Sequence, residues 1–363
     1  MQPRFLIIGA GITGAVLAHR LARDGASVTV VEAVAPTSGA SGRSFGWVNA
    51  SFFLTEAHFH LRLAAMAAHR SLGEELSRPY QPEGCIWFEE TGEAFDRRHA
   101  ALAALDYPLR LLDRAAIAAL EPRMADPPPR ALFFPLEAAQ DLVGLAQAAL
   151  ASASSHGAHM ICGLAVEGLV ANDGRITGIR TAAGEISADH VVLCTGTGTP
   201  ALLAPLGLQL PMLRRPGALL VTRPLPPLLH HILATPDQEV RQDPEGRLVA
   251  PASAHHQGDA AEGLPPPQEM EQATLMRLRH LFPNAFIRPD RLLMAERPVP
   301  GDGLPVIGAV LPGLSMAVMH SGATLAPLVA DLLALEMGGQ GDQPLLAPFR
   351  PARFFAGIET APA

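Results

Sequence analysis

Three glycines near the start of the chain have a spacing that allows backbone to approach a phosphate group. They are Gly9, Gly11 and Gly14, and they directly follow the apolar run Phe5–Ile8. Gly9 permits a tight turn after a strand, Gly11 keeps a side chain out of the path of a pyrophosphate, and Gly14 lets the next helix pack closely. The start of that helix offers N–H groups and the positive end of a dipole to the phosphates. The spacing therefore predicts a dinucleotide-binding turn.

An acidic residue at the end of the second apolar run narrows the choice of dinucleotide. Glu32 closes the run 28–31, where a carboxylate accepts hydrogen bonds from both hydroxyls of a ribose. The same carboxylate repels a 2′-phosphate, so NADP is disfavoured. Ile12 and Thr13 in the turn and Ala33 beside the acid are expected to contribute to the same binding surface.

Composition excludes several classes of protein. The formal net charge of −8 argues against a nucleic-acid partner, because phosphate binding needs a basic surface. The chain contains no lysine, which excludes Schiff-base chemistry on a lysine. Its apolar runs are too short or too interrupted to span a bilayer, and no signal peptide is recognised before the first strand. Cys85, Cys162 and Cys194 are widely spaced and read as free buried thiols of a cytoplasmic protein.

The elements that position these residues alternate between strands and helices. Helices are expected at about 12–24, 56–77, 113–120, 139–155 and 324–336, and a small-residue loop at 37–47. A hairpin is expected from 166–170 and 176–181, and strands at 186–195 and 314–319. The section 207–292 is rich in proline and reads as irregular. The fold class is therefore α/β, with a nucleotide-binding domain that begins at the first strand and ends with the last helix.

Several motifs together resemble the superfamily of FAD-dependent oxidoreductases that contains D-amino-acid oxidase, glycine oxidase and D-amino-acid dehydrogenase. They are the glycine turn with Glu32, the segments 38–49, 113–122, 176–198, 302–308 and 320–327, the pair Arg297-Pro298, and the closing segment 345–354. The resemblance runs along the whole chain in order and is thinnest between about 207 and 290. It implies a two-lobed protein with noncovalent FAD in a discontinuous Rossmann-like domain, made of 1–78, 137–206 and 293–363. A mixed-sheet substrate domain is implied for 79–136 and 207–292.

The resemblance also implies roles for residues outside the glycine turn. Ser41, Gly42 and Arg43 would run beside the pyrophosphate and ribityl chain, and Gly46, Trp47 and Val48 would lie near the flavin ring. Val166 matches a backbone contact to adenine, and Thr195 and Gly196 would again approach the pyrophosphate. The residues that would pass the pyrimidine end of the flavin are Gly308, Ser321, Gly322, Ala323, Thr324 and Leu325.

Two residues are candidates for action on a substrate. Arg297 matches the arginine that binds a substrate carboxylate in family members, and a planar guanidinium holds a carboxylate through two parallel hydrogen bonds. An ion-pair role at the surface or between domains is the alternative. His320 ends an apolar run; it is expected either to polarise substrate, stabilise reduced flavin or tune oxygen reactivity, or to be an ordinary core residue.

The resemblance implies oxidation of the C–N bond of an amino acid or amine by hydride transfer to flavin N5, followed by hydrolysis of the imine. The alternatives are a 2-hydroxy-acid oxidase or dehydrogenase on the same fold and a flavin-binding subunit without turnover of its own. The chain lacks the lysine that promotes oxygen reduction in some relatives, so oxygen or another electron acceptor stays open, as does a homo-oligomer. Family members that act on amino acids often supply a tyrosine from the substrate lobe. This chain has only Tyr80 and Tyr107, both before residue 110, and so departs from the usual amino-acid pocket. The paired histidines 58/60, 230/231 and 255/256 lack metal-ligand spacing and are read as solvated, so no metal is expected.

Overall fold

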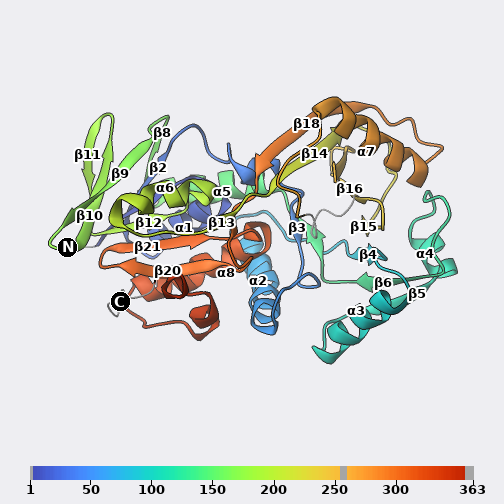
Figure 1. Ribbon diagram of the computed structural model, residues 1–363, viewed down its shortest axis with the longest axis horizontal. Coiled ribbons are helices and arrows are strands. Elements are labelled where there is room, and N and C mark those ends of the chain that lie inside the picture. The colour runs from blue at the N-terminus through green and yellow to red at the C-terminus, as the bar shows by residue number, and fades with distance from the viewer. Residues whose placement is uncertain (1–2, 254–259, 356–363) are drawn as a thin grey trace.

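The computed structural model describes residues 3–253 and 260–355, and Figure 1 shows two lobes side by side. His255 and His256 lie outside the described residues. The left lobe in Figure 1 is built on a six-stranded sheet with the order β20-β21-β12-β1-β2-β8. Its strands are β1 (Arg4–Ile8), β2 (Ser27–Glu32), β8 (His159–Cys162), β12 (His190–Leu193), β20 (Val306–Leu311) and β21 (Leu314–Val318). All neighbouring pairs are parallel except β20 and β21.

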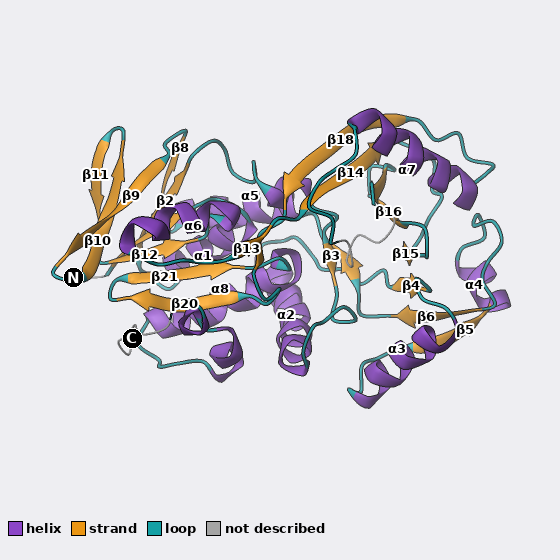
Figure 2. Cartoon of the chain, in the orientation of Figure 1, coloured by secondary structure: helices purple, strands orange, loops and turns teal. Residues whose placement is uncertain are grey.

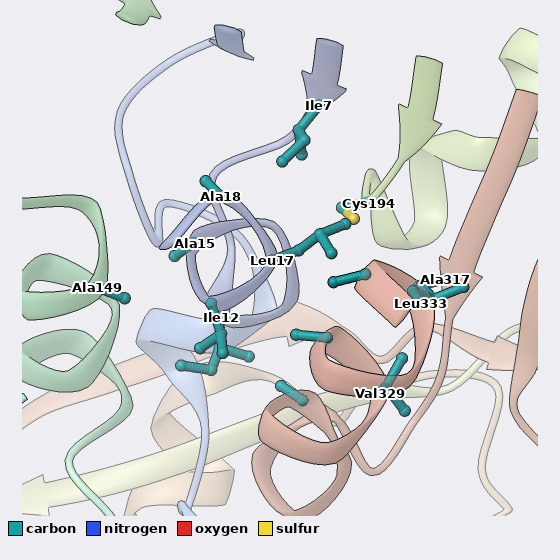
Figure 3. Packing of buried hydrophobic residues seen from close by; sticks show 14 of the residues in the cluster. Ile7, Ile12, Ala15, Leu17, Ala18, Ala149, Cys194, Ala317, Val329 and Leu333 are labelled. Carbon is teal, nitrogen blue, oxygen red and sulfur yellow. The ribbon is translucent and has the colours of Figure 1, made fainter. Parts of the chain in front are cut away.

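Helices cover one face of this sheet. The central one, α1, has apolar side chains on most of its circumference and is therefore buried among the others. It packs between α5 and α8, and α8 in turn contacts α2. Figure 3 shows Ile12 and Ala15 of α1 among Ala149 of α5 and Val329 of α8. The bounds are α1 (Ile12–Arg23), α2 (Glu56–Glu75), α5 (Leu142–Ser155) and α8 (Gly322–Met337). These helices lie close to the predicted positions.

A three-stranded antiparallel sheet, β11-β10-β9, packs on the other face of the six-stranded sheet. Its strands are β9 (Val166–Asn172), β10 (Arg175–Thr181) and β11 (Gly184–Ser187). The predicted hairpin is present, but the predicted strand 186–195 is wrong as a single element. Its start pairs with β10, and its second half is β12 beside β1. The sequence pattern missed this change of sheet because only two residues, Ala188 and Asp189, separate the two strands.

The second lobe contains an eight-stranded mixed sheet in the order β18-β14-β17-β16-β15-β4-β6-β5 (Figure 2). The strands are β4 (Cys85–Trp87), β5 (Arg110–Asp113), β6 (Arg130–Phe134), β14 (Pro216–Thr222), β15 (Ile232–Ala234), β16 (Glu239–Gln242), β17 (Leu248–Pro251) and β18 (Pro289–Glu296). The prediction of an irregular 207–292 is therefore wrong. Prolines at strand ends, such as Pro216 and Pro251, concealed short strands, since proline is tolerated where no ladder hydrogen bond is required.

The remaining elements connect or flank the two sheets. They are α3 (Gly92–Ala104), α4 (Arg114–Leu120), α6 (Thr199–Leu203), α7 (Pro267–Leu281), the paired strands β3 (Trp47–Val48) and β7 (Ala138–Ala139), and the paired strands β13 (Met212–Leu213) and β19 (Val299–Pro300). Strand β18 crosses residue 293, where the sequence places a domain boundary, so that division of the chain stays a prediction. Within the described ranges, no helix is both long and apolar enough to cross a membrane.

Candidate functional site

The turn between β1 and α1 requires glycine at two positions. Gly9 has a φ of +100°, and a Cβ there would lie 2.5 Å from the carbonyl oxygen of Cys194. A Cβ on Gly14 would lie 2.0 Å from the carbonyl oxygen of Gly9. Both distances are far below van der Waals contact, so α1 begins directly against the end of β1. The N–H of Ile12 donates to Oγ of Ser41 at 3.0 Å, which places the predicted pyrophosphate loop beside the helix start.

Glu32 occupies the predicted place at the end of β2. Its two carboxylate oxygens accept N–H groups from Ala10 at 2.8 Å and Val34 at 3.0 Å. These bonds fix the orientation of the carboxylate while each oxygen keeps a further lone pair. The predicted contact of Glu32 with ribose hydroxyls would use these remaining lone pairs.

One cavity of about 480 Å³ joins this turn to segments that are distant in the sequence. The predicted cofactor-binding residues that line it are Gly9, Gly11, Ile12, Thr13, Glu32, Ala33, Ser41, Arg43, Gly46, Trp47, Val166, Thr195, Gly196, Ser321, Gly322, Ala323 and Thr324. The two candidates for action on a substrate, Arg297 and His320, line the same cavity. The structure thus gathers both predicted sets around a single space.

Other predicted residues lie behind the cavity wall, namely Gly14, Gly42, Val48, Gly308 and Leu325. Gly42 packs against backbone, since its Cβ would lie 2.4 Å from the carbonyl oxygen of Thr37. Gly308 faces Nη1 of Arg350, which would be 2.5 Å from a Cβ. Val48 and Leu325 are completely buried in apolar clusters. Direct binding of a cofactor by these residues stays a prediction, whereas their packing role is clear.

Arg297 is anchored to the strand beside it. Its backbone N–H and its Nε both donate to the carbonyl oxygen of Arg215, at 2.9 and 3.1 Å. Its aliphatic part crosses Gly217 of β14, where a Cβ would lie 3.5 Å from Cδ of Arg297. These contacts restrict the guanidinium to one part of the cavity wall. Such restriction reduces the entropy lost when a carboxylate binds.

The start of α8 forms another part of the wall. Ser321 precedes the helix, and its hydroxyl accepts a hydrogen bond from Arg62 rather than capping the helix. Thr324 joins α8 to β3, because its Oγ1 donates to the carbonyl of Trp47 and accepts the N–H of Asn49, both at 3.3 Å. The first N–H groups of a helix have no partner inside the helix, so this end of α8 attracts negative charge.

A buried histidine compensates for a proline inside α8. Pro327 has no N–H, so the carbonyl of Ala323 lacks its usual helical donor. Nε2 of His69 lies 2.8 Å from that oxygen and 3.1 Å from the carbonyl of Thr324. Both partners are acceptors, so Nε2 must carry the hydrogen. Burial lowers the pKa of His69 to about 4, which keeps the ring neutral.

A completely buried carboxylate lies behind Trp47. Glu137 accepts hydrogen bonds from Nε1 of Trp47 at 2.8 Å, the hydroxyl of Tyr107 at 2.9 Å and the N–H of Ser51 at 3.3 Å. Burial raises the pKa of Glu137 to about 7 despite these donors. The hydroxyl of Tyr80 donates to the carbonyl of Leu136 at 2.7 Å. The two tyrosines therefore support the interior near Trp47.

Sequence reasoning missed Arg62 as a cavity residue. This arginine of α2 is 2% exposed and lines the cavity, and its Nε donates to the carbonyl of Asn49 at 3.0 Å. The signal was its spacing, because Arg62 lies three residues after Phe59 and four before Met66 on the buried side of the helix. Also missed were the β14 residues Gly217, Ala218 and Leu219, which the irregular reading of this section hid.

The histidines and cysteines differ in part from expectation. His58 is 4% exposed and His231 contacts the buried Glu121 at 2.7 Å, so the solvated reading is wrong for both. Cys162 is exposed, whereas Cys85 and Cys194 are buried. Burial raises the pKa of Cys194, which lines the cavity, to about 12 and keeps it a thiol. No cluster of three potential metal ligands occurs in 3–253 or 260–355.

Comparisons with known proteins identify the family and the fold. A family model described as FAD dependent oxidoreductase (DAO) matches residues 4–335. The chain is 27% identical to glycine oxidase of Pseudomonas aeruginosa, over 97% of this chain and 99% of that protein. It is 26% identical to the bifunctional protein ThiO/ThiG of Nostoc sp. over its whole length, but spans only 57% of that protein. The crystal structure of glycine oxidase from Geobacillus kaustophilus shares the fold, with a TM-score of 0.85, 24% identity and coverage of 99% and 100% of the two chains.

Proposed function

The chain belongs to the DAO family of FAD-dependent oxidoreductases, and we propose that it oxidises the C–N bond of an amino acid or amine. The observation that supports this substrate class most directly is the position of Arg297, which lines the same cavity as the glycine turn. A guanidinium anchored there is suited to a carboxylate. The names of its relatives, glycine oxidase among them, agree with that chemistry.

The residues around the cavity fit FAD. The glycine turn leaves no Cβ in the path of a pyrophosphate, Glu32 is oriented for ribose, and the only cysteine among the described cavity-lining residues is a protonated thiol. We assign Ser41, Arg43, Thr195 and Gly196 to the pyrophosphate and ribityl side of the cofactor. Gly46, Trp47 and the segment 321–324 are assigned to the ring.

FAD supplies the hydride acceptor in this reaction, which would convert the substrate to an imine that water hydrolyses. The protein's part is placement: Arg297 holds the substrate carboxylate and so fixes where the α-carbon lies. We assign His320 to the wall around the reacting atoms, where its imidazole can take part in hydrogen bonds to the substrate. No protein base is required if the amine arrives unprotonated. Because the chain has no lysine, an acceptor other than oxygen is compatible with this site.

The test is an anaerobic panel of D- and L-amino acids, N-methyl amino acids, 2-hydroxy acids and carboxylate-free amines, read by bleaching of the flavin absorption band. Bleaching by amino acids or amines is the expected result. Bleaching by hydroxy acids alone would assign the alternative reaction on this fold. A protein that binds FAD but is bleached by none of them would contradict the proposal and favour a flavin-binding subunit.

Arg297→Met tests the role of the guanidinium. Loss of one partner of a buried charge pair costs about 2–4 kcal/mol, so kcat/KM for a carboxylate substrate should fall roughly 30- to 1,000-fold. Oxidation of a carboxylate-free amine should change little. Arg214→Met is a matched control, because Arg214 is an exposed arginine in the connection between β13 and β14. Equal effects on both substrate types would remove Arg297 from carboxylate binding.

A further inference from the structure

The cavity wall contains a buried positive charge that binding of substrate by Arg297 does not explain. Arg62 is 2% exposed, and all its hydrogen-bond acceptors are neutral. They are the carbonyl oxygen of Asn49, its Oδ1 at 2.5 Å, and the hydroxyl of Ser321. Removing a guanidinium from water costs several kcal/mol unless an anion accompanies it. These partners therefore satisfy the hydrogen-bond donors of the guanidinium but do not compensate its positive charge.

The surrounding protein compensates the charge only in part. Burial lowers the pKa of Arg62 to about 10, while a negative charge on Glu137 acts in the opposite direction. Glu137 is itself engaged with Trp47 and Tyr107, and no ion pair between Arg62 and a carboxylate occurs in the part of the chain described. An anion in the cavity is the remaining means of compensation.

The geometry shows where that anion belongs. Arg62 and the start of α8 meet at Ser321, since the guanidinium donates to its hydroxyl and the helix begins at the next residue. Both features line the cavity and both are positive. The segment 321–324 is the one assigned above to the flavin ring, whose reduced form carries a negative charge in its pyrimidine part.

We propose that Arg62 is a positioning residue that fixes Asn49 and Ser321 at the start of α8 and, through its charge, favours the reduced form of the bound flavin. The inference rests on the placement of FAD under the proposed function, but not on the identity of the substrate. It predicts that the reduction potential of bound FAD depends on Arg62.

The experiment measures the midpoint potential of FAD in the purified holoenzyme against a reference dye, with no substrate present. Arg62→Met keeps a long side chain without the charge, and should shift the oxidised-to-reduced equilibrium at least tenfold toward oxidised flavin, about 30 mV for a two-electron couple. Arg62→Lys keeps the charge but reaches fewer acceptors, so a shift of about threefold is expected. Arg70→Met is the matched control, because Arg70 is exposed on the same helix, and should give no shift.

Other assignments of the anion predict different results. An unchanged potential with weaker FAD binding would assign Arg62 to the pyrophosphate, and an unchanged potential with a raised KM for carboxylate substrates would assign it to the substrate. Either result overturns the proposal, as does an equal shift in Arg70→Met. If Arg62→Met does not fold, Ser321→Ala removes one hydrogen-bond acceptor of Arg62 and should shift the equilibrium about threefold toward oxidised flavin. No shift in Ser321→Ala would again refute the proposal. Because no substrate is used, a failed substrate panel leaves this readout intact.

Discussion

Replacing His69 tests whether a side chain can stand in for the hydrogen bond that a proline removes from a helix. His69→Phe keeps a planar ring of similar size but leaves the carbonyl of Ala323 without its donor at 2.8 Å. An unsatisfied buried carbonyl costs about 1–3 kcal/mol, so the free energy of unfolding should fall by that amount. Urea unfolding followed by circular dichroism, with linear extrapolation to water, gives the value.

A second substitution separates the lost hydrogen bond from any packing defect. Pro327→Ala restores an N–H at residue 327, and this N–H can reach the same carbonyl within the helix. In that background His69→Phe should cost at least about 1 kcal/mol less than in the natural sequence, which is the coupling energy of a double-mutant cycle.

The matched control is His60→Phe on the same helix, because the His60 side chain is 52% exposed and should matter by less than about 0.5 kcal/mol. The reasoning is refuted if His69→Phe costs the same with and without Pro327. It is also refuted if the single substitution is no more costly than the control.

Three further predictions concern buried groups and the glycine turn. Burial lowers the pKa of His58 to about 3, so between about pH 6.5 and pH 3 the unfolded chain binds a proton that the folded chain does not, and stability is lost as pH falls below about 6.5. His58→Phe should therefore move the midpoint of acid unfolding to lower pH. An unmoved midpoint would contradict this. The pKa of Glu137 is raised from 4.5 to about 7, so its contribution is present below pH 4.5 and lost as pH rises through 7. The free energy of unfolding of Glu137→Gln minus that of the natural protein should therefore rise by up to ~3 kcal/mol between pH 5 and pH 8. A difference that stays constant with pH would count against the raised pKa of Glu137. Gly14→Ala, whose Cβ would meet a backbone oxygen at 2.0 Å, should abolish FAD retention on gel filtration, whereas Gly263→Ala, with nothing within 4 Å and away from the cavity, should retain it.

The sequence predicted the elements whose residues have a recognisable spacing. The glycine turn and Glu32 were found from their spacing alone, although Gly9 packs on the carbonyl of Cys194 and Glu32 accepts the N–H of Ala10. The helix start at 56 agrees with the prediction, whereas the start at 142 lies three residues after the predicted 139; Thr55 and Asp141 cap these helices by accepting N–H groups of the first turn. The two caps need no knowledge of the remaining chain.

The parts that could not be predicted depend on contacts between distant segments. Short strands such as β15 and β16 carry too few residues for a period of two to be visible, and they form because β4 and β17 lie beside them. The role of Arg62 depends on Ser321, which is 259 residues away. The compensation of Pro327 by His69 likewise cannot be read from either helix alone.

The order of strands in the six-stranded sheet also has a consequence for synthesis of the protein on the ribosome. Strand β1 pairs on one side with β2, but its other neighbour is β12, which ends at Leu193, and the next strand, β21, ends at Val318. At ~5–20 residues per second, the nascent chain carries an open edge of β1 for roughly 10–40 s before β12 is made. Throughout that time an apolar strand edge is exposed to other chains. Expression at low temperature or with chaperones that bind extended apolar segments should therefore raise the yield of this protein more than it would for a fold completed locally.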